Sequence, residues 1–216
     1  MVFLFDVDNT LLDNDRVTLD LRRHLARKVG DDRAAEYFLI FEQLRVELGY
    51  ADYLKALQRY RVQHPHDPHL LDVSGFLINY PFANRLFPGA LDAIENASHS
   101  GPTVIFSDGD VVFQPRKVER SGLAEAVEGR ILIYIHKDQE LEDVQRRYPA
   151  NHYVLIDDKV RILSAVKRSW KDRVTTVFVR QGHYATAPDV ASSDPADLSV
   201  DRIGELGNWR WSFSAC

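Results

Sequence analysis

Two aspartates stand two residues apart directly after the first apolar run of the chain. Residues 2–5 (VFLF) lead into Asp6 and Asp8, and Thr10 follows two residues later. Carboxylates at the end of a buried strand are costly unless a positive charge lies beside them. The spacing therefore predicts a site that also contains a divalent cation, a lysine or both.

Three later apolar runs also end in polar side chains. Ser107 follows the second run, Lys137 the third, and Asp157 and Asp158 the fourth. In an open parallel sheet, ligands bind beyond the carboxyl ends of the strands. We therefore expect these four residues to meet Asp6 at one edge of a sheet.

This set of residues suits phosphoryl transfer assisted by Mg²⁺. The candidate ligands are hard oxygens, with no cysteine or histidine among them, which favours Mg²⁺. A carboxylate held beside the ion can attack phosphorus and form an aspartyl phosphate. A second carboxylate two residues on can protonate the leaving oxygen and then deprotonate water, and neighbouring acids would raise its pKa for that role. Ser107 can donate to a phosphoryl oxygen, and Lys137 can offset the charge that accumulates there.

The segments that carry these residues have the pattern of buried parallel strands. Five of them are apolar nearly throughout: residues 2–5, 103–106, 131–135, 153–156 and 174–179. Such runs are typical of a sheet covered on both faces, and helical patterns alternate with the later four. One helix should begin after Asp138 as its N-cap, and the tail 194–209 should contain a last short helix. The sequence thus predicts an α/β fold with a Rossmann-like parallel sheet.

A long helical stretch interrupts this alternation after the first strand. Residues 15–85 contain no strand pattern, whereas apolar residues such as Leu21 and Leu25 recur at helical spacing. About 70 residues are too many for a loop and enough to pack on themselves. We therefore expect a Rossmann-like catalytic core of residues 1–14 and 86–216 and an inserted α-helical cap of residues 15–85.

Four motifs in this order resemble those of the haloacid dehalogenase-like (HAD) superfamily, which consists mostly of Mg²⁺-dependent phosphatases. They are DVDNT at residues 6–10, FSDG at 106–109, Lys137, and IDD at 156–158. Each motif is weak alone, but four in order at strand ends make a specific signal, and the resemblance covers nearly the whole chain. It implies a helical cap of the C1 type and hydrolysis of a small phosphate monoester with Mg²⁺ as cofactor.

The resemblance also implies a role for each matching residue. Asp6 would be the nucleophile and a metal ligand. Asp8 would be the acid/base, with its backbone carbonyl on the metal. Thr10 would support this substrate-binding loop, and Ser107 and Lys137 would bind the phosphoryl group.

The acid pair of the last motif would complete the metal site. Asp158 would ligate Mg²⁺, and Asp157 would do so directly or through water. The dehalogenases that give the family its name lack an acid at the position of Asp8. Its presence therefore favours phosphoryl transfer over carbon–halogen cleavage.

Three other functions use similar residues. A phosphomutase would use the same side chains but return the phosphoryl group to its substrate. A non-catalytic HAD-fold regulatory or binding protein would keep the fold, although the complete set of catalytic residue types weighs against it. A receiver domain also has Asp, Ser or Thr, and Lys at strand ends, but in another order and without room for a cap.

Several polar residues near the motifs are interpreted as structural. Lys117 is the rival of Lys137, but it falls within a predicted helix rather than at a strand end. Asp108 and Asp110 are interpreted as turn residues, and Lys159 as a salt-bridge partner of the acid pair. His183 and Tyr184, which follow the fifth strand, are expected in a loop.

The predicted cap contains its own candidates. His64, His66 and His69 resemble a transition-metal tract, but the interleaved prolines favour a solvated turn. Arg45, Tyr50 and Arg61 are candidates to reach the cleft, and the sequence does not rank them. Four aromatic residues are expected in the core of the bundle rather than around substrate: Phe38, Phe41, Tyr53 and Tyr60.

Composition restricts the partners and the setting. The chain has 216 residues, 45% of them hydrophobic and 27% charged, which is ordinary for a globular protein with a real core. A net charge of −5 without any Lys/Arg block argues against nucleic acid or a membrane surface, and the expected partner is a small phosphorylated metabolite. No apolar run approaches the ~18 residues of a membrane span, and no secretory signal pattern is visible. The single cysteine, Cys216, rules out a disulfide within the chain and fits a cytoplasmic setting.

Overall fold

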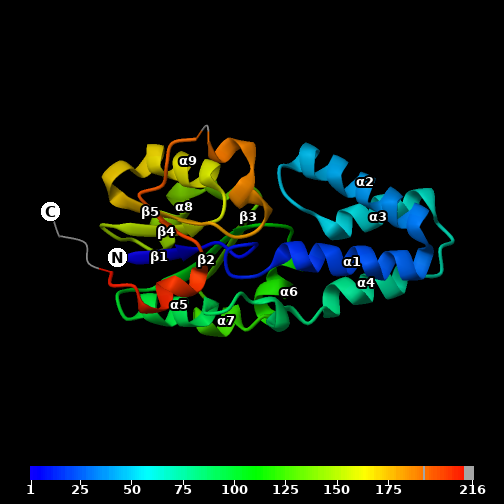
Figure 1. Ribbon diagram of the computed structural model, residues 1–216, viewed down its shortest axis with the longest axis horizontal. Helices are drawn as coiled ribbons and strands as arrows, with labels where there is room; N and C mark the ends of the chain where they lie inside the picture. The colour runs from blue at the N-terminus through cyan, green and yellow to red at the C-terminus, as the bar shows by residue number, and fades with distance from the viewer. Residues whose placement is uncertain (192, 212–216) are drawn as a thin grey trace.

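A parallel sheet with β1 near its centre organises the molecule. The computed structural model describes residues 1–191 and 193–211, and its six strands have the order β3-β2-β1-β4-β5-β6 (Figure 1). The strand bounds are β1 Val2–Phe5, β2 Thr103–Asp108, β3 Ile131–Tyr134, β4 Tyr153–Asp157, β5 Val174–Val179 and β6 Leu198–Val200. The predicted α/β class and the five predicted strands are confirmed. Because β1 pairs with β2 on one side and β4 on the other, Asp6 leaves the sheet between them.

Helices cover both faces of the sheet, which is why its strands are almost uninterrupted apolar runs. Phe3 and Phe5 of β1 point into one hydrophobic cluster, whereas Val2 and Leu4 point into the other. Figure 1 shows α5, α6 and α7 on one side of the sheet and α8 and α9 on the other. Their bounds are α5 Ala90–Ser98, α6 Phe113–Arg120, α7 Leu123–Ala126, α8 Leu141–Arg147 and α9 Val160–Trp170.

Four helices between β1 and β2 project beyond the carboxyl ends of the strands (Figure 1). They are α1 Asn14–Val29, α2 Asp31–Leu48, α3 Tyr53–Gln63 and α4 Leu70–Asn79, and we call them the helical insertion. Helix α1 begins after Asp13, whose carboxylate accepts a hydrogen bond from the amide of Arg16 at 2.9 Å. It ends at Gly30, whose φ of 86° suits glycine better than any other residue.

The interior of the insertion is aromatic. Helix α2 packs against both α1 and α3, and the predicted bundle residues Phe38, Phe41, Tyr53 and Tyr60 are all buried. The ring of Phe41 stacks on that of Tyr53 with centroids 4.6 Å apart. These contacts give the insertion a hydrophobic interior of its own, while the boundaries proposed for the two domains stay a prediction.

Two parts of the C-terminal half differ from the sequence-based expectation. The chain forms a 3₁₀ turn, η2, over Lys137–Gln139, so α8 has Glu140 rather than the expected Asp138 at its N-cap. The tail contains β6 as well as a short helix, the 3₁₀ helix η6 at Ile203–Asn208. A three-residue strand is too short to show a period in the sequence.

The remaining short elements are 3₁₀ turns, η1 Phe82–Arg85, η3 Lys171–Arg173, η4 His183–Thr186 and η5 Pro188–Val190. Among the residues that the structure describes, no helix combines the length and the apolar character that crossing a membrane requires. Cys216 lies outside the described residues.

Candidate active site

Acids and a lysine from distant parts of the chain meet where β1, β2 and β4 end. The Nζ atom of Lys137 lies 2.6 Å from Oδ1 of Asp6 and 2.6 Å from Oδ2 of Asp157. Asp158 belongs to the same cluster, since carboxylate oxygens of the three aspartates lie within 4.8 Å of one another. The hydroxyl of Thr10 donates to Oδ2 of Asp6 at 3.2 Å. Five of the seven candidate residues are therefore together at one rim.

The carboxylate cluster fits a hard divalent cation. Its donor atoms are all carboxylate oxygens, the ligands that Mg²⁺ prefers. Both oxygens of Asp158 are buried and accept no hydrogen bond from any described residue, which is rare for a buried polar group. Burial raises the pKa of Asp158 well above its ordinary value, because the charged form has lost its water. A cation held by Asp6, Asp157 and Asp158 would supply the missing partner.

Lys137 is held in place through both its backbone and its side chain. Its amide donates to Oδ1 of Asp108 at 2.7 Å, and its Nζ also donates to the carbonyl of Phe106 at 3.1 Å. Burial alone would lower the pKa of Lys137, but the carboxylates of Asp157 and Asp6 outweigh that effect and raise it. Lys137 therefore carries its positive charge although it is fully buried. Asp108, interpreted from the sequence as a turn residue, is the last residue of β2 and fixes the turn that carries this lysine.

Ser107 lies on β2 beside the loop that follows β1, but its hydroxyl is hydrogen-bonded to Gln114 and Asp108 rather than to the clustered acids. Its hydroxyl accepts from Nε2 of Gln114 at 3.0 Å and donates to the carbonyl of Asp108 at 3.3 Å. The parallel pairing of Phe5 with Ile105 places Ser107 level with the residues just after Asp6. Its part in binding a phosphoryl group stays a prediction.

Asp8 lies apart from the carboxylate cluster and contacts Lys117, the rival of Lys137 that is interpreted from the sequence as structural. Nζ of Lys117 donates to Oδ1 of Asp8 at 2.5 Å and to Oδ1 of Asn14 at 3.0 Å. Lys117 is in a helix, α6, as expected, but its side chain is only 1% exposed. The suggested contact between the Asp8 backbone carbonyl and the metal stays a prediction.

A sequence signal for Lys117 does exist. On α6, Phe113, Gln114, Lys117 and Val118 are all buried, so the lysine stands on the inward face of the helix. In the sequence, Lys117 stands one helical turn after Phe113, so the two share one face of the predicted helix, and a lysine on an inward face needs a partner. Because Lys117 lies within a helix, the pattern of polar residues at strand ends does not indicate it.

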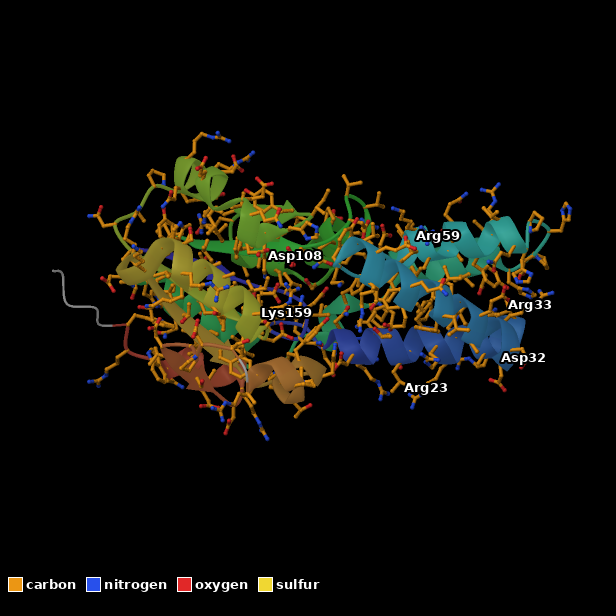
Figure 2. All side chains as sticks on the ribbon, turned by 90° about the horizontal axis from the view of Figure 1, so that it is seen from above. Arg23, Asp32, Arg33, Arg59, Asp108 and Lys159 are labelled. Atoms are coloured by element: carbon orange, nitrogen blue, oxygen red, sulfur yellow. The ribbon has the colours of Figure 1, made fainter. Side chains whose placement is uncertain are left out.

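A pocket of about 290 Å³, which we call the rim pocket, lies between the insertion and the chain just beyond β1. Asp8 and Asp108 line it from the sheet side, and Arg45 and Tyr50 line it from the insertion. Asp108 and Lys159 are labelled in Figure 2, where they lie near the junction of the two parts. Arg61 lines a different pocket, on the surface formed by α3 and α4, so of the three unranked residues only Arg45 and Tyr50 line the rim pocket.

Charged residues of the pocket wall are largely paired with one another. Asp15 at the start of α1 binds Nδ1 of His183 at 2.6 Å, and Glu42 contacts Arg45 at 3.2 Å. The nearby acids raise the pKa of Lys159 against the opposing effect of burial, and its Nζ lies 5.1 Å from the centre of the Tyr184 ring. His183 and Tyr184, expected only as loop residues, thus form part of this wall.

The histidine tract of the insertion gathers no metal ligands. His64 pairs with Glu36 at 2.8 Å, and His69 pairs with Asp67 at 3.1 Å. The only group of three or more potential ligands found among the described residues is the carboxylate cluster at the rim. Acid partners from α2 and from the turn itself account for two of the three histidines.

The fold and this site define a Rossmann-like α/β protein whose acidic rim lies beside an inserted set of helices. No protein-family model matches the chain, and no curated protein matches it. Among solved structures, a haloacid dehalogenase-like hydrolase of Burkholderia xenovorans is 60% identical, with 97% of this chain and 98% of that chain covered and a TM-score of 0.93. The chain belongs to the haloacid dehalogenase-like family of hydrolases.

More distant structures share the fold. A HAD hydrolase of Bacillus subtilis, solved bound to magnesium, is 18% identical, with 95% of this chain and 96% of that chain covered and a TM-score of 0.65. The L-2-haloacid dehalogenase of Xanthobacter autotrophicus is 16% identical over the same shares, with a TM-score of 0.62. Likeness at this level shows the fold alone, so the chemistry has to be argued from the site.

Proposed function

We propose that the protein is a Mg²⁺-dependent phosphatase that hydrolyses a small phosphate monoester through an aspartyl-phosphate intermediate. The observation that carries the proposal is the carboxylate of Asp8 in the pocket wall, two residues beyond Asp6. Phosphoryl transfer needs an acid there to protonate the leaving alcohol, and the family resemblance implies that dehalogenases lack one. The pocket of about 290 Å³ suits a small metabolite rather than a polymer.

Each side chain then has a task. Asp6 attacks phosphorus as the bond from phosphorus to the leaving oxygen breaks, and Asp8 gives its proton to that oxygen. Asp8 next takes a proton from water, which attacks phosphorus and releases phosphate and Asp6. Lys137, with Ser107, binds phosphoryl oxygens and offsets their charge. Mg²⁺ held by Asp6, Asp157 and Asp158 would neutralise charge on the transferring group.

The insertion would exclude bulk water from the intermediate. The pocket lies between the sheet rim and the insertion, so substrate binding there would be covered on both sides. Tyr50 and Arg45 would contact the leaving group.

A phosphate-release screen tests the proposal. Small phosphate esters would be incubated with Mg²⁺ or with a chelator, using the wild-type chain, Asp6→Asn, and Asp13→Asn as a matched control. Asp13 caps α1 through the amide of Arg16, a task that asparagine also performs. We expect free phosphate to require Mg²⁺, to vanish with Asp6→Asn and to persist with Asp13→Asn.

Three other outcomes of this screen and of a parallel chloride-release assay separate the alternatives. Transfer of the phosphoryl group to a second substrate position, without free phosphate, would instead identify a phosphomutase. Chloride release from 2-chloropropionate without phosphate release from any ester would identify a dehalogenase. Inertness in both assays would support a non-catalytic role.

A further inference from the structure

Lys117 is a buried charge to which the reaction described above gives no task. It belongs to the C-terminal turn of α6, 1% exposed, with its Nζ 5.2 Å from the centre of the Phe113 ring. Removing an ammonium group from water costs several kcal/mol unless its partners replace the lost hydration. The carboxylate of Asp8 and the amide oxygen of Asn14 are the partners that the structure provides.

The contact fixes one side of the Asp8 carboxylate and leaves the other to the pocket. Lys117 binds Oδ1, while the Asp8 side chain is 22% exposed and forms part of the pocket wall. An acid that transfers a proton must sit within hydrogen-bond reach of the leaving oxygen, and an unrestrained aspartate has several rotamers. A fixed cation behind it selects one of them.

The same ammonium group connects Asp8 to the insertion. Asn14 is the first residue of α1, and its Nδ2 donates to the hydroxyl of Tyr53 at 3.2 Å. That hydroxyl also lies 2.6 Å from Oγ1 of Thr18, and Tyr53 is buried at the start of α3. A polar chain therefore runs from the acid on the sheet side, through Lys117, to two helices of the insertion.

We propose that Lys117 is a positioning residue that holds Asp8 toward the leaving group and couples its orientation to the first turn of α1. The inference rests on the proposed phosphatase function, because it assumes that Asp8 transfers the proton. Lys117 itself moves no proton. When the bond from phosphorus to the leaving oxygen breaks, the proton passes from Asp8 to that oxygen while Lys117 remains bound to Oδ1.

The test compares two substrates of nearly equal shape whose leaving groups differ in basicity. 4-Nitrophenyl phosphate releases a weakly basic phenolate that needs little protonation, whereas phenyl phosphate releases a phenolate whose acid has a pKa near 10, as for the tyrosine side chain. Loss of a well-placed general acid should therefore slow phenyl phosphate more. We expect Lys117→Met to reduce kcat for phenyl phosphate roughly tenfold more than for 4-nitrophenyl phosphate.

Four further variants make the comparison specific. Asp8→Asn should show the same selective loss, and the double variant Lys117→Met with Asp8→Asn should lose little beyond Asp8→Asn alone, because residues that act through one another are not additive. Lys117→Arg, which keeps the charge, should recover part of the phenyl phosphate activity. Lys167→Met is the matched control, since Lys167 binds Asp197 at 2.9 Å on the far side of the sheet.

Each outcome decides the proposal. Equal losses on both substrates, or additive losses in the double variant, would show that Lys117 only supports the fold. If Lys117→Met does not fold, Lys117→Gln, which removes the charge but keeps a polar side chain, carries the same test, and an unchanged ratio of the two substrates would overturn the proposal. A wild-type protein that hydrolyses neither substrate with Mg²⁺ would instead overturn the proposed function, and the role of Lys117 with it.

Discussion

The adjacent acids Asp157 and Asp158 should respond in opposite ways to the same change. Both are fully buried, but Asp157 lies 2.6 Å from Nζ of Lys137 and accepts a hydrogen bond from the amide of Lys159 at 2.8 Å. Neither oxygen of Asp158 accepts a hydrogen bond from a described residue. Burial raises the pKa of Asp157 as well, against the opposing effect of Lys137, but its carboxylate has partners whereas that of Asp158 has none among the described residues. In the absence of metal, Asp→Asn should therefore remove a paired charge at 157 and an unpaired one at 158.

Two opposing effects determine the change in folding stability expected for Asp158→Asn. At pH 7 a carboxyl group can escape the cost of burying its charge by binding a proton, which limits the penalty to about 4 kcal/mol for a group with an ordinary pKa near 4. Asparagine would still leave polar atoms without partners, at roughly 1–3 kcal/mol. We expect a net gain of about 2 kcal/mol for Asp158→Asn, or about 4–8 °C in Tm for a chain of this size.

Asp157→Asn should lose stability instead. It leaves Lys137 with Asp6 as its remaining carboxylate partner and weakens a buried ion pair, a change that costs about 3 kcal/mol when a partner is removed outright. The two variants are isosteric and one residue apart, so each is the control for the other.

Mg²⁺ should reverse the order of wild type and Asp158→Asn. A ligand present at 100 times its Kd stabilises the folded state by about 2.7 kcal/mol. Thermal unfolding in chelator and in millimolar Mg²⁺ measures both effects. The reasoning is refuted if Asp158→Asn is less stable than wild type in chelator, or if it gains as much from Mg²⁺ as wild type does.

Three further changes test other parts of the structure. Although burial opposes the shift, hydrogen bonds hold the pKa of Asp67 below its ordinary value. The stability that the charged Asp67 contributes is therefore present above pH 4 and is lost as pH falls through the lower folded-state pKa. Asp67→Asn should cost about 2 kcal/mol in urea unfolding at pH 7 and less at pH 3, and an equal cost at both pH values would contradict this. Gly182→Ala should cost about 2 kcal/mol or more, since a Cβ there would lie 2.5 Å from Cβ of Asn9 at a φ of +67°. The control Gly122→Ala has a φ of +84° but nothing within 4 Å of the added Cβ, so it should cost about 1 kcal/mol. Equal losses of Tm in the two variants would show that the contact with Asn9 has no effect. Lys137→Met should cost about 3 kcal/mol in chelator and be partly restored by Mg²⁺, and thermal unfolding that shows no such recovery would argue against a shared charge cluster.

Much of the fold was predictable because its physical causes are local in the sequence. Strand β1, which leads into Asp6, and β4, which ends at Asp157, are buried on both faces, so the residues before these acids are apolar or aromatic. Since parallel strands share a direction, their carboxyl ends lie at the same edge of the sheet, and the sequence alone predicts that the residues beyond them meet there. That reasoning placed Lys137 beside Asp6 although 131 positions separate them.

The contacts of Asp8 could not be predicted in the same way. Lys117 reaches Asp8 from the inward face of a helix, at a position that depends on how α6 lies against β2. Asn14 and Tyr53 join them only because α1 and α3 return to the rim from the insertion. The sequence shows which helices exist, but their packing angles decide which side chains enter a pocket.

The contacts of the pocket wall could not be predicted from the sequence either. Asn9 adopts a φ of 62°, accepts from the amides of Asn14 and Asp15, and donates to Oδ1 of Asp15. The turn after β5 packs Gly182 directly against it and brings His183 to Asp15. These interactions depend on close backbone approach between loops 170 residues apart in sequence, for which no periodicity gives a signal.

The charges of the rim indicate that metal and phosphate should bind together. With all three ionised, Asp6, Asp157 and Asp158 place three negative charges around Lys137 and Lys159, a net charge of −1 that repels a phosphate dianion, although burial raises the pKa of both Asp157 and Asp158. Mg²⁺ would change this to +1, which attracts it. Because coupling between two ligands is reciprocal, inorganic phosphate should raise Tm in the presence of Mg²⁺ and have little effect in chelator, and phosphate should tighten Mg²⁺ binding by the same factor in calorimetry. Phosphate stabilisation of equal size in chelator would show that the lysines alone bind the anion and that the three carboxylates are not charged together.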